Sequence, residues 1–293
     1  MEFRIPSFVY KKFVKPVIRC YNRKMIEMNI QMGDYMITST SNPQVKNLVL
    51  LNKKAKERIR QGVFLTEGKK MLKEAPREWI HKIYVSESYI MNEENLKELQ
   101  GFTYEILSDS VFRAVSDTVT PQGVLTVTAI PKWNYTKILE SKNGCFLLLE
   151  GIQDPGNLGT MLRTAEAAGM TAVIADKTTV DIYHPKTIRG TMGSIYRIPF
   201  FAAEDFEGLI NEMKQKEIKL YAAHLGGSFL YDEMDYKGAC GFLIGNEGNG
   251  LTEKTASLAE VRIQIPMAGK TESLNAAVAA AVLMYEANRQ RRR

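Results

Sequence analysis

The chain has 293 residues, of which 45% are hydrophobic and 25% charged, a composition typical of a globular protein with about two domains. No apolar run reaches the roughly 20 residues of a membrane span, and three scattered cysteines and three histidines disfavour a disulfide framework or a structural zinc site and fit a reducing cytoplasm. The net charge of +6 falls entirely in the front half, with +4 on residues 1–36, +2 on residues 37–130 and zero on residues 131–293. Two interpretations stay open: the front half binds a polyanion, or the charge serves solubility alone.

Residues 1–38 are predicted to be a basic extension with little fixed structure. Lysine and arginine interrupt every apolar run there, so the segment lacks the apolar core of a secretory signal. Two interpretations stay open: a basic tail that touches RNA, or a stretch that is not translated. The second arises because several methionines precede the first well-patterned segment, namely Met25, Met28, Met32 and Met36.

Residues 39–130 are predicted to be a small α/β domain. Ser41 or Asn42 can cap a helix that has Pro43 in its first position. Strand-like apolar runs then alternate with helical patterns, which indicates a sheet with helices packed on it. The expected strands are 63–65, 83–85, 104–107 and 124–127, and the expected further helices are 68–74, 93–99 and 110–115. Phe64 and Phe112 are expected in the core.

A basic run separates the first helix of this domain from its first strand. Residues 53–60 hold five positive charges and one negative charge. Such a run is usually a solvated helix face, but at a helix–strand junction it can also follow a phosphate backbone, where lysine and arginine gain affinity by releasing counterions. The candidate RNA-binding residues are Lys53, Lys54, Lys56, Arg58 and Arg60.

The pattern changes after residues 131–144, a polar segment with the composition of a linker. The run 145–149 is a continuous apolar strand, as expected in a parallel sheet that is covered on both faces. Asp154 and Pro155 then suit the start of a helix, which a further strand follows. This βαβ unit and the later strand-like runs predict an open α/β domain over residues 145–293. The later runs are 172–175, 198–201, 218–222, 242–244 and 263–265.

Two loops follow strand ends in this domain, and ligands of open α/β sheets bind outside the carboxyl ends of the strands. The loops, residues 245–251 and 265–275, contain glycine, asparagine, proline and serine, and the second opens a helix whose first thirteen residues from Ser273 carry no charge. The glycine run reads GxxGxG rather than the dinucleotide fingerprint GxGxxG, and no GxxxxGK[ST] loop is present, so an oxidoreductase is a remote alternative. The loops leave open a pocket of backbone groups for another nucleoside-like ligand.

Four polar side chains lie beside these strand ends. Each has an ordinary explanation, because Arg163 can pair with Glu166 one turn along the helix and Glu247 can be a loop carboxylate in water. Ser273 and Asn275 can cap the last helix. Together the four would place a cation, an anion, a hydroxyl and an amide at the ends of one sheet, which favours a functional site.

Three motifs resemble those of a known family. NLGTMLR at 157–163, IGNEGNGL at 244–251, and IPM and SLN within 265–275 are similar, in order and spacing, to the motifs of the SpoU (TrmH-type) RNA ribose 2′-O-methyltransferases. The resemblance covers about residues 145–290. Residues 39–130 resemble the L30e-like RNA-binding domain that often precedes it.

The resemblance implies a SPOUT fold, in which the C-terminal segment of a parallel α/β sheet is threaded into a deep trefoil knot. It also implies a homodimer with the uncharged helix 274–285 at its interface, and S-adenosyl-L-methionine held by backbone groups in the knot, with no metal. The implied cofactor-binding residues are Gly245, Ile265 and Leu274, with Leu225 and Met267 beside them. The implied catalytic residues are Asn157, Arg163, Glu247, Ser273 and Asn275.

The implied reaction is methyl transfer to a ribose 2′-hydroxyl in 23S rRNA, since a free-standing front domain favours rRNA over tRNA. Arginine stays protonated in proteins, so we expect Arg163 to bind the phosphate beside the target ribose or to stabilise the developing alkoxide. Glu247 and Asn157 would hold Arg163, and Ser273 and Asn275 would shape the last loop. The alternatives are a tRNA ribose 2′-O-methyltransferase and a non-catalytic RNA-binding ribosome-assembly factor on the same fold.

Overall fold

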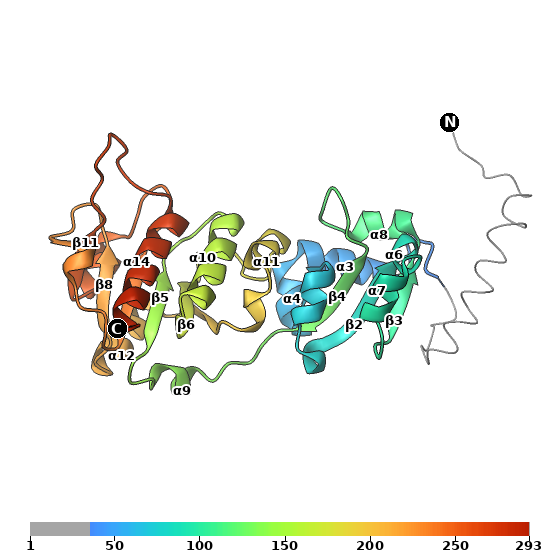
Figure 1. Cartoon of the computed structure of the whole chain (residues 1–293), viewed down its shortest axis with the longest axis horizontal. Helices are drawn as coiled ribbons and strands as arrows, with labels where there is room; N and C mark the ends of the chain where they lie inside the picture. The colour runs from blue at the N-terminus through green and yellow to red at the C-terminus, as the bar shows by residue number, and fades with distance from the viewer. Residues whose placement is uncertain (1–35, 293) are drawn as a thin grey trace, which may run out of the picture.

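The computed structural model describes residues 36–292, which form two α/β domains side by side along the long axis of the molecule (Figure 1). The front domain already includes Ile37, which is buried and pairs with Leu107 in an isolated β-bridge. The predicted basic extension therefore lies almost wholly outside the described residues.

The front domain is a four-stranded sheet in the order β1-β4-β2-β3, with helices packed on it. The strands β1 and β2 run antiparallel to β4, and β3 runs parallel to β2. The first helix begins where expected, because Asn42 Oδ1 accepts a hydrogen bond from Gln44 N at 2.8 Å. The strands are β1 Val63–Glu67, β2 Ile80–Ser86, β3 Tyr104–Leu107 and β4 Val124–Ala129. The helices are α3 Pro43–Lys53, α4 Ala55–Gln61, α5 Lys69–Glu74, α6 Glu87–Ile90, α7 Glu93–Glu98 and α8 Asp109–Val115.

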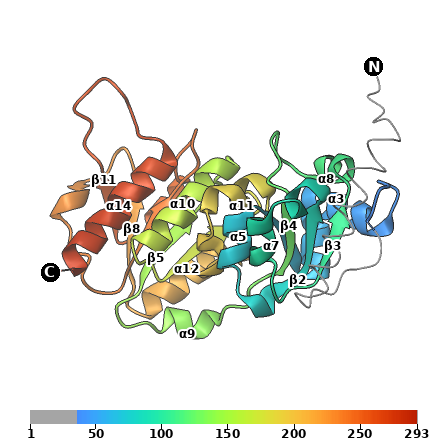
Figure 2. The ribbon, with the colours of Figure 1, turned by 45° about the vertical axis from the view of Figure 1, so that its right-hand side comes forward.

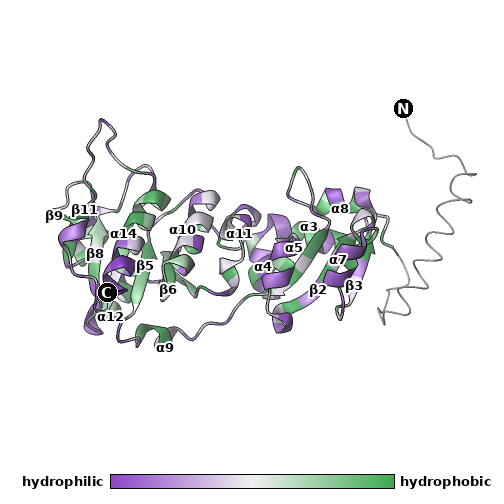
Figure 3. Cartoon of the chain, in the orientation of Figure 1, coloured by the Kyte–Doolittle hydropathy of each residue, from purple (hydrophilic) through white to green (hydrophobic). Residues whose placement is uncertain are grey.

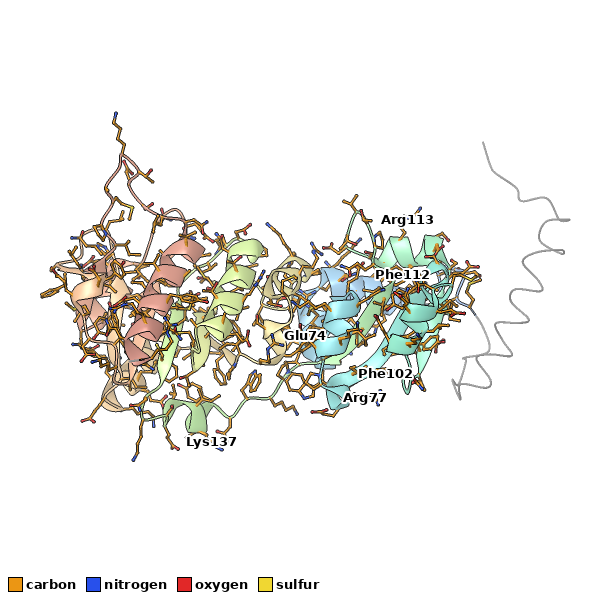
Figure 4. The ribbon with its side chains drawn as sticks, in the orientation of Figure 1. Glu74, Arg77, Phe102, Phe112, Arg113 and Lys137 are labelled. Atoms are coloured by element: carbon orange, nitrogen blue, oxygen red, sulfur yellow. The ribbon has the colours of Figure 1, made fainter. Side chains whose placement is uncertain are left out.

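Phe64 and Phe112 are both fully buried, which confirms the prediction that they are core residues. They belong to different cores. Phe112 lies inside the front domain (Figure 4), whereas Phe64 packs in the apolar cluster of the second domain. The hydrophobic core therefore continues from one domain into the other.

The segment 131–144 contains a helix, α9 Tyr135–Leu139, that packs against the second domain. Its Tyr135 hydroxyl donates to Glu212 Oε2 at 3.0 Å, and its ring meets the ring of Phe201 at 5.3 Å between centroids. The polar composition indicated only a linker, but Asn134 caps this helix and was the available signal.

The second domain is built on a seven-stranded sheet in the order β7-β6-β5-β10-β8-β11-β9, in which every pairing is parallel. The predicted parallel α/β sheet is therefore confirmed. The strands are β5 Cys145–Leu149, β6 Ala172–Asp176, β7 Phe200–Ala203, β8 Lys219–Ala223, β9 Phe229–Leu230, β10 Cys240–Ile244 and β11 Val261–Gln264. The longer helices are α10 Pro155–Ala167, α11 Pro185–Thr191, α12 Phe206–Gln215, α13 Glu253–Leu258 and α14 Ala276–Arg291.

The central strands β5 and β10 are apolar along their whole length (Figure 3), because helices cover both faces of the sheet. Leu147 and Leu149 pack on one face beneath α10 and α14, while Phe146 and Leu148 pack on the other beneath α12. Within residues 36–292, no helix has the length and apolar character that crossing a bilayer requires.

Candidate active site

The loops that follow β5, β10 and β11 meet at one edge of the sheet, because the carboxyl ends of parallel strands lie together. Asn246 Nδ2 donates to the carbonyl of Gly151 at 2.7 Å and so ties the β10 loop to the β5 loop. On the far side, His224 N donates to the carbonyl of Ile263 at 2.9 Å and ties the loop after β8 to β11. The sheet therefore fixes the relative positions of these loops.

The glycine loop after β10 is closed by its own backbone. Asn246 N donates to Gly250 O at 3.0 Å and Gly250 N donates to Asn246 O at 2.9 Å. Asn246 Oδ1 accepts from Gly248 N at 2.8 Å and from Asn249 N at 3.1 Å. A Cβ on Gly245 would lie 2.0 Å from the carbonyl carbon of Gly250, so only glycine fits there.

Three polar side chains that the sequence singled out form one hydrogen-bonded chain. Glu247 accepts from Asn157 Nδ2 at 2.9 Å, and from the backbone N–H groups of Gln153 at 3.1 Å and Asp154 at 3.2 Å. Asn157 Oδ1 in turn accepts from Asn275 Nδ2 at 3.1 Å. Asn275 also caps α14, so the chain links the loops after β5 and β10 to the start of the last helix.

Hydrogen bonding keeps Glu247 charged. Partial burial acts to raise the pKa of its carboxyl, but the hydrogen bonds from Asn157 and from the backbone of Gln153 and Asp154 outweigh burial and hold this pKa below its ordinary value of 4.5. At neutral pH Glu247 is therefore an acceptor of hydrogen bonds and not a proton donor.

The lowered pKa gives a testable pH dependence of stability. A carboxyl whose pKa is lower in the folded state stabilises the fold above its unfolded pKa, and this contribution is lost as pH falls through the folded pKa. We expect Glu247→Gln to lower the melting temperature at pH 7 by about 2 °C. The difference from the unsubstituted protein should shrink in thermal melts as pH falls through the folded pKa of Glu247, which lies below 4.5. A difference that stays constant from pH 7 down into this acidic range would contradict this account of Glu247.

Arg163 lies on α10 with its side chain exposed. The pairing with Glu166 that its spacing allowed is absent, because Glu166 Oε1 accepts instead from Arg197 Nε at 2.9 Å. Over the whole of residues 36–292, the guanidinium of Arg163 has neither a hydrogen bond nor an ion pair. The structure does not join Arg163 to the Glu247–Asn157–Asn275 chain, and its guanidinium is open to an anion.

Three of the five predicted cofactor-binding positions lie in or next to residues 266–274, a loop whose backbone is uncommitted. Ile265, Met267 and Leu274 are half-buried, whereas Leu225 is 70% exposed and Ser273 is exposed. Among the described residues, none of the backbone or side-chain groups of residues 266–274 makes a hydrogen bond. Most of these residues are exposed, so their N–H and C=O groups are accessible to water or to a ligand held through backbone groups.

The structure corrects one predicted RNA-binding residue. Lys53, Lys54 and Lys56 are exposed, and Arg60 is exposed but pairs with Glu57 at 2.7 Å. Arg58 is only 3% exposed and forms an ion pair with Asp181 of the second domain. Because residues two apart on a helix point to nearly opposite sides, α4 turns Arg58 toward the second domain while its neighbours face solvent.

Two acidic residues that the sequence reading missed fix the loops at this edge. Glu150 accepts from Thr252 N at 2.8 Å and from Thr252 Oγ1 at 2.9 Å, which holds the end of the glycine loop. Asp176 accepts from Gly151 N at 2.9 Å and from Thr179 Oγ1 at 2.7 Å. A carboxylate directly after or at the end of a buried strand was the signal for both. In the part of the chain that the structure describes, no group of three or more metal-binding side chains comes together.

Comparison with known proteins identifies the family. Residues 144–285 match the model of the SpoU rRNA Methylase family, and residues 42–126 match the MRM3-like substrate binding domain. The 23S rRNA (guanosine(2553)-2′-O)-methyltransferase RlmP of Bacillus subtilis is 34% identical over 251 residues, which are 85% of this chain and 97% of that protein. The chain belongs to the SpoU rRNA methylase family.

Solved SpoU structures show the same fold. The methyltransferase AviRb from Streptomyces viridochromogenes, in complex with AdoMet, has 25% identity and a TM-score of 0.78 over 85% of this chain and 98% of its own. The AdoMet-bound rRNA methyltransferase from Sinorhizobium meliloti has 30% identity and a TM-score of 0.75 over 87% of this chain and 97% of its own. The resemblance to SpoU methyltransferases is therefore confirmed, as is their fold, and the cofactor of the family is S-adenosylmethionine. The knot itself stays a prediction.

Proposed function

We propose that the protein transfers a methyl group from S-adenosylmethionine to a ribose 2′-hydroxyl of 23S rRNA. The observation that carries the proposal is the hydrogen-bonded chain of Glu247, Asn157 and Asn275 at the carboxyl edge of a SpoU sheet, beside helix α10, which carries the unpaired Arg163. The relative from Bacillus subtilis is named for 2′-O-methylation of a guanosine in 23S rRNA, which supports this class of substrate.

The cofactor would be held by backbone groups of Gly245, Ile265 and Leu274, beside Leu225 and Met267. When bound, it supplies a methyl group on a positively charged sulfur, which a ribose oxygen can attack. The glycine loop supports this placement, because its closed backbone leaves no room for a side chain at residue 245, and only backbone groups are present there. The uncommitted backbone of residues 266–274 supports it further, since those groups can recognise an adenosine and an amino-acid carboxylate.

Arg163 would bring positive charge to the reacting oxygen. Since a guanidinium does not lose its proton at neutral pH, Arg163 would bind the phosphate beside the target ribose or stabilise charge that develops on the 2′-oxygen. Asn157 and Glu247 would hold the loops around it, Asn275 would fix the start of α14, and Ser273 would line the last loop. The 2′-hydroxyl proton would leave to solvent as the bond between the oxygen and the methyl carbon forms and the bond between that carbon and the sulfur breaks.

A homodimer would complete the molecule. Val278 and Tyr285 are both about half exposed on α14, although they are large and apolar. They are seven residues apart and therefore share one face of the helix. A second copy of the chain packed on this face would remove both side chains from water, and α10, which packs against α14 and carries Arg163, would lie near the same interface.

The front domain would bind the RNA substrate. Three exposed lysines near the junction of α3 and α4 can neutralise phosphates, namely Lys53, Lys54 and Lys56. Arg60 can do so only after it breaks its ion pair with Glu57. The match to a substrate-binding domain supports this role. An rRNA substrate would place the protein in the cytoplasm.

Methyl transfer from labelled S-adenosylmethionine to total rRNA and to total tRNA tests the proposal. We expect label in 23S rRNA, and mapping should find it on a ribose 2′-oxygen. Label in tRNA alone would replace the substrate that we propose. Binding of both RNA and cofactor without any transfer would contradict enzymatic activity and favour an RNA-binding assembly factor.

A further inference from the structure

Helix α11 is held by the front domain near both of its ends. Just before the first residue of α11, Asp181 accepts a hydrogen bond from Nε of Arg58 at 3.1 Å. Within the front domain, Nη1 of Arg58 donates to the carbonyl of Asn52 at 3.1 Å. Near its last residue, Arg189 Nη1 pairs with Asp117 of the front domain at 2.7 Å. Arg58 is almost fully buried and Asp181 is partly buried, so salt screens their ion pair less than it screens an exposed pair.

The surrounding contacts also join the two domains. Phe64 of β1 packs against Tyr183 with ring centroids 4.9 Å apart. Glu74, which Figure 4 shows on the side of the front domain that faces the second domain, pairs with Arg197 at 2.7 Å. A buried apolar contact and three ion pairs therefore connect the front domain to one segment, residues 181–197.

The same helix α11 is in backbone contact with α10 (Figure 2). A Cβ on Gly159 of α10 would lie 2.6 Å from the carbonyl oxygen of Thr187, and a Cβ on Gly190 of α11 would lie 3.1 Å from Cα of Gly159. No side chain separates the two helices there, so a shift of α11 must displace α10.

A second link joins α11 to the start of α10. Lys186 Nζ pairs with Asp154 at 2.7 Å, and Asp154 Oδ1 caps α10 by accepting from Asn157 N at 2.9 Å. Since α10 carries Arg163 as well as Asn157, the path runs from Arg58 through Asp181 and α11 to both predicted catalytic residues of that helix.

We propose that Arg58 and Asp181 are positioning residues through which the front domain, acting on α11, sets the position of α10 for methyl transfer. The inference rests on the proposed function, because its consequence is an RNA held by one domain at a fixed place relative to Arg163 on the other. A displacement of about 1 Å between reacting groups can cost about a hundredfold in rate. The pair therefore acts on kcat through α10 and not on cofactor affinity.

Asp181→Asn is the decisive variant, because it removes the charge and keeps the shape of the side chain. We expect kcat for methyl transfer to 23S rRNA to fall about tenfold or more, while the Kd for S-adenosylmethionine stays within about twofold and the KM for RNA changes less than kcat. Arg58→Lys keeps the charge but loses the planar fork, and it should give a smaller loss of kcat.

Lys82→Gln is the matched control. It breaks an ion pair with Glu105 at 2.9 Å that lies wholly within the front domain, and it should leave kcat unchanged. If Asp181→Asn lowers kcat no more than Lys82→Gln, the proposal is wrong. Loss of cofactor binding in step with kcat would also overturn it, because it would show a general loss of structure.

Hydrogen exchange separates this inference from the proposed function, since it needs no activity. Amides of α10, Pro155–Ala167, should exchange faster in Asp181→Asn and in Arg58→Lys than in Lys82→Gln. Unchanged exchange in α10 would refute the path through α11 whatever the protein methylates. Faster exchange in a protein that methylates no RNA would keep the path and reject the proposed function.

Discussion

Arg163→Ala is expected to lower kcat for methyl transfer by about a hundredfold or more, with the Kd for S-adenosylmethionine within about twofold of the unsubstituted value. The side chain is exposed and, among the residues that the structure describes, unpaired. Its removal therefore breaks no contact that holds the fold together, so a loss of rate reports on the reaction. Single-turnover transfer to 23S rRNA and calorimetric titration of the cofactor measure the two quantities.

Arg163→Lys and Lys216→Ala are the controls for this loss. Lysine keeps the charge but not the two-pronged geometry that matches phosphate. The kcat of Arg163→Lys should therefore lie between that of Arg163→Ala and that of the unsubstituted protein. Lys216 is an exposed cation at the end of α12, which covers the opposite face of the sheet, and its removal should leave kcat unchanged. Full activity in Arg163→Ala would remove Arg163 from the reaction.

Local signals were enough to place the sheet and the site loops. The uniformly apolar runs at β5 and β10 are typical of strands buried on both faces. The loops that follow parallel strands all lie at the same edge of the sheet. The family motifs then identified Asn157, Glu247 and Asn275, which the structure joins in one hydrogen-bonded chain.

Long-range pairing could not be read from the sequence. Glu166 is three residues from Arg163 and was a reasonable partner for it. Arg197 pairs with Glu166 instead, because the fold brings the short 3-10 helix Ser194–Tyr196 beside α10. Arg58 sits in a basic run and looked like a phosphate contact, but the packing of the second domain turns α4 so that this one cation is buried.

Short helices were missed for a different reason. Helix α11 has 7 residues, too few for an apolar period to stand out, and its Pro185 start was the main local signal. Its role in joining the domains depends on Gly190 meeting Gly159, a contact between residues that no local pattern relates.

Gly245→Ala is expected to weaken S-adenosylmethionine binding by about ten- to a hundredfold. The new methyl carbon would lie 2.0 Å from the carbonyl carbon of Gly250 and 2.1 Å from the amide nitrogen of Leu251, and backbone atoms cannot rotate away as a side chain can. The loop must open, which breaks the paired hydrogen bonds between Asn246 and Gly250. Strain of about 1–3 kcal/mol corresponds to the expected range of affinity loss.

Gly248→Ala in the same loop separates this effect from a general intolerance of alanine. A Cβ at Gly248 would have Asn246 Oδ1 as its nearest neighbour at 3.4 Å, an ordinary contact, so cofactor affinity should stay within about twofold. Calorimetric titration of both variants gives the comparison, and thermal melts check that each is folded. Equal and unchanged affinity in the two variants would mean that the cofactor does not depend on the closed glycine loop, and the site would then have to lie elsewhere on the sheet edge.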